Sequence, residues 1–157
     1  MKLTDFVVQG AIVPELQATD RNGVIRELVK SVCDASGVSA QSAETIAKAV
    51  IQRENQGSTG FGKGVAVPHV KHALVPKIMS TIGRIPAGLD FSALDRAPVY
   101  TVVVLLSPPD NPDGHLQAME SIFRHLQRDN FRRFLRQAET ASAIWELIKE
   151  ADEMPAG

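Results

Sequence analysis

The feature that most constrains the fold is an unbroken run of apolar or β-branched residues at 101–106, TVVVLL. The run lies within 98–106 (PVYTVVVLL), the most strand-like segment of the chain. A strand with one solvated face alternates apolar and polar residues, whereas a continuous apolar run is typical of a strand buried on both faces. We therefore expect a central strand inside a layered domain.

Helical segments are expected on both sides of this strand in the sequence. Asp20 and Ser39 are the expected N-caps of the first two helices, and Gly37 is expected to end the first. Apolar residues at intervals of three and four positions predict amphipathic helices at about 20–37, 39–55, 115–128, 131–137 and 140–151.

Shorter strands and loops fill the remaining segments. Residues 64–67 predict a strand that Pro68 interrupts, which puts His69 at a strand end. A further strand is expected at 79–85, loops are expected at 86–95 and 107–114, and residues 1–16 fit either short strands or an extended lead-in. Interleaved helices and strands favour an α/β fold with one mixed sheet flanked by helices on both faces. We expect a single domain over 1–157, with flexible ends at 1–10 and 153–157.

Composition excludes several classes of function. The 157 residues are 44% hydrophobic and 22% charged, an ordinary globular composition. The net charge of -1 provides no basic field, so we expect neither a nucleic-acid partner nor binding to anionic lipid. Cys33, the one cysteine, cannot form an internal disulfide, and no apolar run reaches the length of a membrane span. A cytoplasmic protein without membrane insertion fits best.

A glycine-rich stretch at 53–69, RENQGSTGFGKGVAVPH, contains four glycines within 57–64 and ends on His69. Residues 57–63 match the first seven positions of the nucleotide-binding pattern G-x-x-x-x-G-K-[ST]. Gly64 stands where that pattern needs a hydroxyl for magnesium, and this loop follows a helix and enters a strand, the reverse of the nucleotide-binding order. Nucleotide binding is therefore a minor alternative.

The histidines allow several interpretations. His69 and His72 form an H-x-x-H pair, but on an extended segment this spacing points the rings to opposite faces. No Cys, Asp or Glu nearby completes a ligand set, so we expect no metal and no cofactor. His72 and His125 are expected to be ordinary hydrogen-bonded residues. Arg53, at the end of its helix, is either a solvated residue favoured by the helix dipole or part of a site.

Three segments resemble a known family. The block 53–69 resembles the active-site signature of phosphotransferase system enzyme IIA domains of the fructose/mannitol type, whose stand-alone members include the nitrogen-regulatory enzyme IIA. Residues 88–109 (GLDFSALDRAPVYTVVVLLSPP) and 115–126 (HLQAMESIFRHL) are similar to the family's central strands and to its helix with a second histidine. The resemblance extends over about residues 10–150.

The resemblance implies roles for three residues. It implies that His69 is phosphorylated and that His115 and Arg53 lie beside it. A neutral imidazole is a competent nucleophile at cytosolic pH, and phosphoryl transfer needs chiefly positioning and charge stabilisation. His115 and Arg53 are therefore the expected stabilisers. Further hydrogen bonds to the phosphoryl group are expected from the loop residues Ser58, Thr59, Gly60 and Gly62.

The resemblance also implies the partners. The chain is expected to accept a phosphoryl group from a histidine-containing phosphocarrier protein and to pass it to an enzyme IIB or to keep it as a regulatory mark. The nitrogen-regulatory kind is favoured over sugar transport. The alternative is a non-catalytic module that binds a regulated kinase or transporter according to its phosphorylation state. No role for Lys63 or His72 follows from the sequence.

Overall fold

The computed structural model describes residues 1–93 and 95–154. Five α-helices, two short 3-10 helices and five strands make up the described chain. They are η1 (Leu3–Asp5), η2 (Gln9–Ala11), α1 (Arg21–Ala35), α2 (Ala40–Gln56), β1 (Gly60–Gly62), β2 (Val65–Ala66), β3 (His69–Lys71), β4 (Met79–Leu89), β5 (Val99–Ser107), α3 (Pro112–Leu126), α4 (Asp129–Gln137) and α5 (Ala141–Asp152).

Strand β5 is the centre of the mixed sheet. On one side it pairs antiparallel with β4, and on the other it pairs parallel with β2 and then with β3. The two short strands are successive parts of one extended segment, and Pro68 lies between them. The Pro68 carbonyl still accepts the Leu105 amide at 3.0 Å, so the interruption costs only the amide that proline lacks. β1 folds back on β2 at the sheet edge.

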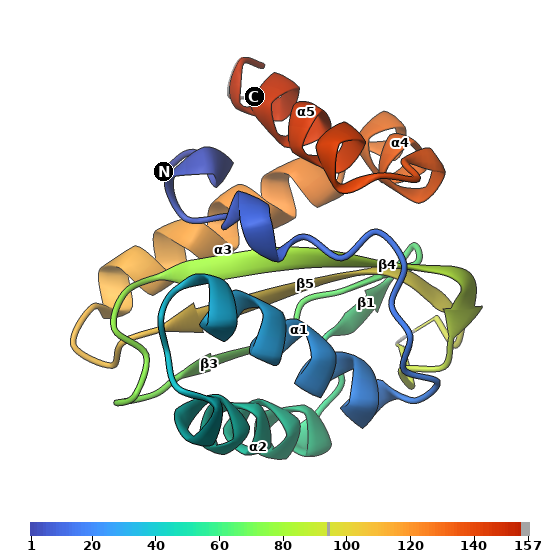
Figure 1. Cartoon of the computed structure of the whole chain (residues 1–157). Helices are drawn as coiled ribbons and strands as arrows, with labels where there is room; N and C mark the ends of the chain where they lie inside the picture. Colours follow the sequence, from blue (N-terminus) through green and yellow to red (C-terminus); the bar gives the residue numbers. More distant parts are fainter. Residues whose placement is uncertain (94, 155–157) are drawn as a thin grey trace.

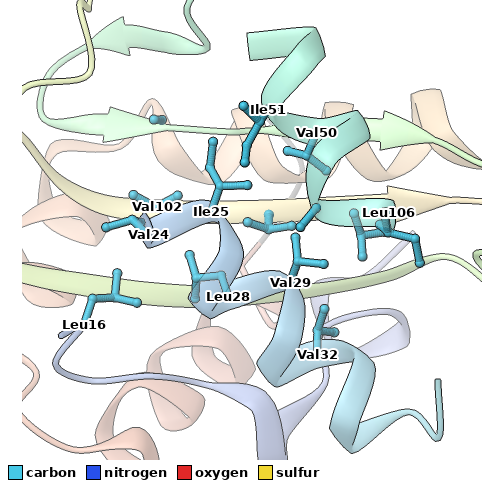
Figure 2. Close-up of a cluster of buried hydrophobic side chains, with 14 of the residues drawn as sticks. Leu16, Val24, Ile25, Leu28, Val29, Val32, Val50, Ile51, Val102 and Leu106 are labelled. Atoms are coloured by element: carbon cyan, nitrogen blue, oxygen red, sulfur yellow. The ribbon is translucent and has the colours of Figure 1, made fainter. Parts of the chain in front are cut away.

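Helices cover both faces of this sheet, as the sequence predicts (Figure 1). α1 and α2 lie on one face, and α3, α4 and α5 lie on the other. The side chains of β5 alternate between the two layers: Val102 and Leu106 pack with α1 and α2, and Leu105 packs with the C-terminal helices. Figure 2 shows the first cluster, in which Ile25 and Val29 of α1 meet the sheet. The continuous apolar run is thus confirmed as a strand buried on both faces.

The expected helix ends are largely confirmed. The Asp20 carboxylate accepts the Gly23 amide at 2.6 Å at the start of α1, and the Ser39 hydroxyl accepts the Ser42 amide at 3.2 Å at the start of α2. α3 begins three residues before the predicted start, because the Asn111 side chain accepts the Gly114 amide and Pro112 occupies the first helical position. His115 is therefore in the first turn of α3.

Two expectations about strands are wrong. β4 continues to Leu89, four residues into the predicted loop. Its pairing with β5 shifts register between Arg84 and Leu89, and Pro86 lies within this irregular part, where a missing amide is tolerated. His69 was expected where a strand ends, but it is the first residue of a further strand, β3, because pairing with β5 resumes directly after Pro68.

The sequence predicts a flexible end at 1–10, and residues 1–16 fit either short strands or an extended lead-in. The structure has two 3-10 helices there, with single parallel bridges from Val7 and Val13 to β4. Leu3 and Phe6 are buried. The expected C-terminal flexible end, 153–157, lies partly outside the described residues.

Asp152, at the end of α5, fastens this segment to the C-terminal helix. Its carboxylate accepts the Leu3 amide at 2.7 Å, the Thr4 amide at 2.9 Å and the Thr4 hydroxyl at 2.7 Å. Among the described residues, no helix is both long enough and apolar enough to cross a membrane.

We predict that Asp152→Ala lowers the free energy of unfolding by about 1–3 kcal/mol, since it removes an acceptor from two amides and a hydroxyl. Urea unfolding followed by circular dichroism measures the change. Glu153→Ala is the matched control, because Glu153 is an exposed neighbour and its loss should change stability by no more than about 0.5 kcal/mol. Equal unfolding midpoints for the two variants would contradict the role given to Asp152.

Candidate functional site

The fold brings His69 and His115 together from separate elements. His69 is the first residue of β3, and His115 lies in the first turn of α3. Their ring centroids are 5.7 Å apart and the rings are inclined by 47°. Both side chains are partly exposed. The pair therefore forms a solvent-accessible site at the junction of a strand and a helix.

The tautomer of His69 follows from its backbone contact. Its Nδ1 lies 2.8 Å from the Val67 carbonyl oxygen. A carbonyl oxygen can only accept, so Nδ1 carries the hydrogen and donates it. In the neutral ring the lone pair is then on Nε2. His69 thus presents one unprotonated nitrogen, held in orientation by the strand before it.

His115 is held through its own Nδ1. That nitrogen lies 2.7 Å from the hydroxyl of Ser107, the last residue of β5. Ser107 is fully buried. A hydroxyl can donate as well as accept. The contact orients the His115 ring and couples it to the end of the central strand.

Burial keeps both imidazoles neutral. Desolvation, with His69 and Lys71 nearby, lowers the pKa of His115 to about 4. Desolvation is also the largest cause that lowers the pKa of His69; the Val67 hydrogen bond opposes it and the Arg53 charge adds to it. Both shifts favour the neutral base. A neutral nitrogen is the form that can act as a nucleophile.

Arg53 and Glu54, in the last turn of α2, have different surroundings. Arg53 is partly exposed and donates to the Gly57 carbonyl at 3.2 Å, close enough to His69 to affect its pKa. Glu54 is only 2% exposed. Its carboxylate accepts both the amide and the hydroxyl of Thr59 at 2.8–3.1 Å. Glu54 therefore fixes the start of the glycine-rich loop.

The loop residues are bonded within the chain. The Ser58 hydroxyl donates to the Phe91 carbonyl at 2.7 Å and accepts the Gly60 amide at 3.0 Å, while the Thr59 groups are taken by Glu54. Gly62 has a φ of 99°, a conformation that favours glycine. Hydrogen bonds within the chain therefore fix the conformation of the loop. The loop follows the helix α2 and leads into the strands β1 and β2, whereas a nucleotide-binding loop follows a strand and leads into a helix.

The two remaining histidines lie outside the pair. The His72 Nδ1 accepts the Leu74 amide at 3.0 Å. His125 is buried against Phe131, with ring centroids 5.9 Å apart. Within the described part of the chain, no group of three or more His, Cys, Asp or Glu residues is placed to hold a metal ion.

Sequence reasoning missed Glu54 and Ser107. A signal for Glu54 was present, because an acidic residue in the last turn of a helix opposes the helix dipole and so needs another reason to be there. No such signal was present for Ser107, since its sequence neighbourhood, SPPDNPDG, is typical of a turn. Only the approach of α3 to the end of β5 makes its hydroxyl a partner of His115.

These features define a class: an α/β domain that presents a neutral, backbone-anchored histidine beside a second histidine on its surface. The family model of the phosphoenolpyruvate-dependent sugar phosphotransferase system, EIIA 2, matches residues 6–151. The chain belongs to this family of phosphocarrier domains. The family assignment and the mixed-sheet fold expected from the sequence are thereby confirmed.

Two curated relatives differ in extent. A nitrogen regulatory protein of Bradyrhizobium diazoefficiens is 32% identical over 148 residues, 94% of this chain and 95% of that protein. A fructose-specific EIIABC component of Bacillus subtilis is 31% identical over 153 residues, which are 98% of this chain and 24% of that protein. The chain thus spans about a quarter of the multi-component relative and nearly all of the nitrogen regulatory one.

Solved structures share the fold. The nitrogen regulatory protein IIA-Ntr of Neisseria meningitidis has a TM-score of 0.81 at 23% identity, over 92% of this chain and 97% of that chain. The mannitol enzyme IIA of Escherichia coli, solved in complex with phosphorylated enzyme IIB, has a TM-score of 0.73 at 18% identity, over 90% of this chain and 95% of that chain.

We predict that the His115 ring stays neutral down to about pH 5, because its pKa is about 4. A histidine in an unfolded chain titrates near pH 6.5. Between these values the unfolded chain binds more protons, so the free energy of unfolding should fall as the pH falls from about 6.5 to 4.

Imidazole NMR titration measures the first effect, with the resonance assigned by its loss in His115→Gln. Urea unfolding from pH 4 to 7.5 measures the second effect, and its slope should be shallower in His115→Gln. Half-protonation of His115 near pH 6.5 would refute the shift.

Proposed function

We propose that this chain carries a phosphoryl group on Nε2 of His69, as a cytoplasmic phosphohistidine carrier. The observation that carries the proposal is the Nδ1 contact to the Val67 carbonyl at 2.8 Å, which leaves Nε2 as the free nitrogen. Desolvation, which lowers the pKa of His69, adds to it by keeping that nitrogen unprotonated. Because the ring is already oriented, a donor has to approach from one direction only.

The transfer balances without a cofactor. The donor is a histidine-containing phosphocarrier protein whose P–N bond breaks as Nε2 of His69 forms a new P–N bond. The donor nitrogen leaves with the electron pair of the broken bond. Positive charge that develops on the His69 ring is stabilised by the Nδ1 hydrogen bond to Val67. In the onward transfer the P–N bond at Nε2 of His69 breaks as the acceptor forms its own bond to phosphorus, and Nε2 keeps the electron pair.

His115 and Arg53 stabilise the oxygens of the phosphoryl group in this proposal. If Ser107 donates its hydroxyl hydrogen to Nδ1 of His115, Nε2 of that ring carries the hydrogen and donates it to an oxygen. Arg53 supplies a guanidinium from the end of α2. The first turn of α3, where His115 lies, adds the positive end of the helix dipole.

The loop has a positioning role in the same proposal. Ser58 and Thr59 were expected to bond the phosphoryl group, yet their hydroxyls are used by Phe91 and Glu54. The negative charge of the Glu54 carboxylate is bonded to the amide and the hydroxyl of Thr59 in the loop. Gly60 and Gly62 let the chain turn tightly before β2. The loop therefore holds the approach to His69 in one shape.

The onward partner is an enzyme IIB or a regulated protein. The match to a nitrogen regulatory protein along almost the whole of both chains favours a regulatory role, with a kinase or transporter as target. The match to a fructose-specific component keeps sugar transport as the second candidate. Phosphate recovered on a IIB protein would favour transport. Binding to a target that depends on phosphorylation without onward transfer would favour the regulatory module.

We predict that incubation with labelled phosphoenolpyruvate, enzyme I and the phosphocarrier protein labels the chain with an acid-labile, alkali-stable phosphoryl group on Nε2 of a single histidine. His69→Ala should abolish the label, because His72 and His115 do not have the contact of Nδ1 to a backbone carbonyl that leaves Nε2 of His69 free. Phosphohistidine NMR identifies the nitrogen. His72→Ala is the control and should label fully; a label that persists in His69→Ala overturns the site.

We predict that Ser107→Ala slows labelling of His69 about fivefold, because one neutral hydrogen bond of about 1 kcal/mol is lost. Ser80→Ala is the matched control, since the Ser80 hydroxyl is buried without a hydrogen-bond partner among the described residues. The ¹⁵N shifts of His115 report its tautomer and should change in Ser107→Ala only. An unchanged tautomer with normal transfer would remove Ser107 from the mechanism.

A further inference from the structure

A basic hollow lies away from the histidine pair. It has a volume of about 400 Å³ and is lined by four cations, one carboxylate and one amide. The lining residues are Lys63, Asp129, Arg132, Arg133, Arg136 and Gln137. The whole chain has a net charge of -1, so this concentration of positive charge is local. The cations come from two segments far apart in the sequence, the β1–β2 turn and α4.

Two of the three arginines of α4, Arg133 and Arg136, are held in place by uncharged groups. The Arg136 guanidinium carbon lies 3.6 Å from the centre of the Tyr100 ring. The Arg133 guanidinium donates to the Asn130 side chain at 2.9 Å and lies 5.3 Å from the Phe134 ring centre. These contacts fix the planar forks while leaving their charge in place.

Among the residues that the structure describes, one of the four cations has a carboxylate partner. Arg132 pairs with Asp129 and also donates to the Leu126 carbonyl at 2.7 Å. In the part of the chain that the structure describes, no carboxylate lies within ion-pair distance of the Lys63, Arg133 or Arg136 side chains. Four cations with one carboxylate, Asp129, among them leave an excess of positive charge, and like charges repel one another. An anion in the hollow would relieve that repulsion.

Lys63 completes the hollow from a constrained turn. Lys63 and Gly64 connect β1 to β2 with φ values of 61° and 80°. A positive φ is unusual for lysine and is a turn position that asparagine or glycine normally fills. The Lys63 amide donates to Asp95 at 3.1 Å, which holds the turn. The chain thus keeps a lysine at a position that disfavours it.

The hollow is separate from the phosphoryl-carrying site. The Gly64 carbonyl, beside Lys63, accepts the Tyr100 amide at the start of β5, whereas His69 lies opposite Leu105. Tyr100 and Leu105 are about 16 Å apart along an extended strand, at a rise of about 3.3 Å per residue. A ligand in the hollow is therefore not a ligand of the histidine pair.

We propose that this hollow binds a small molecule with two or more linked phosphate groups. Guanidinium forks match phosphate oxygens in a bidentate manner. Arg132 is paired with Asp129, so the forks of Arg133 and Arg136, with Lys63, are the cations left to neutralise phosphate charge. The volume falls within the range of small-molecule sites, about 300–1,000 Å³. Because the cations converge on one concavity from two segments, the arrangement suits a compact polyanion better than an extended acidic protein face.

Inorganic tripolyphosphate is the probe, titrated into the ¹⁵N-labelled chain at 150 mM KCl, where exposed charges are well screened. We expect saturable shifts confined to α4 and the Lys63–Gly64 turn, with a Kd of about 1 mM or tighter. Inorganic monophosphate should bind at least about tenfold more weakly. ATP tests the source: tighter binding than tripolyphosphate identifies a nucleotide, and equal or weaker binding identifies free polyphosphate.

Arg133→Gln combined with Arg136→Gln should weaken tripolyphosphate binding at least about tenfold, and Lys63→Gln alone, which removes one cation instead of two, should weaken it about threefold. Arg26→Gln combined with Lys149→Gln is the matched control, since it removes the same charge from exposed ion pairs elsewhere. An equal loss in this control would show that net charge alone is responsible and would overturn the site.

Other outcomes also overturn the proposal. Shifts centred on Arg53 and His69 would place the probe at the histidine pair. Equal affinity for monophosphate would indicate an adventitious ion only. Tighter binding of a glutamate-rich peptide than of tripolyphosphate would identify an acidic protein surface as the partner.

Discussion

The parallel pairing of residues 65–71 with β5 is the constraint on which the site depends. Pro68 removes one amide from this segment, yet its carbonyl accepts the Leu105 amide and pairing resumes at His69. The Val67 carbonyl is thereby directed to Nδ1 of His69 at 2.8 Å. At its far end β5 supplies Ser107, which contacts His115. One buried strand therefore serves as the common reference for both histidines.

The two helical layers explain why strand β5 is rigid. Leu105 and Leu106 are fully buried on opposite faces, so β5 cannot shift without disturbing both clusters. The site itself lies at the ends of strands and helices, where side chains remain partly exposed. A buried scaffold with an accessible edge suits a carrier that must meet other proteins. Burial lowers the pKa of His115 to about 4 and so keeps this neighbour of His69 from adding a second positive charge.

Much of this could be predicted from particular residues. The run at 101–106 predicted the doubly buried strand, Asp20 and Ser39 predicted two helix starts, and His69, His115 and Arg53 were selected through the family signature. The end of β4 was missed because a proline normally argues against a strand, and only the irregular pairing with β5 shows that Pro86 is tolerated. Ser58 and Thr59 were expected to face the phosphoryl group, whereas the structure gives their hydroxyls to Phe91 and Glu54.

The sequence by itself determined the layered α/β class, the family and the histidine that is the candidate for phosphorylation, because apolar periodicity and short motifs are local properties of the chain. Only the tertiary structure decided the tautomer of His69, the partners of Glu54 and Ser107, and the convergence of Lys63 with the arginines of α4. Each of these depends on atoms that are distant in sequence or on the path of the backbone, and hydrogen bonds and charges act over a few ångströms of space.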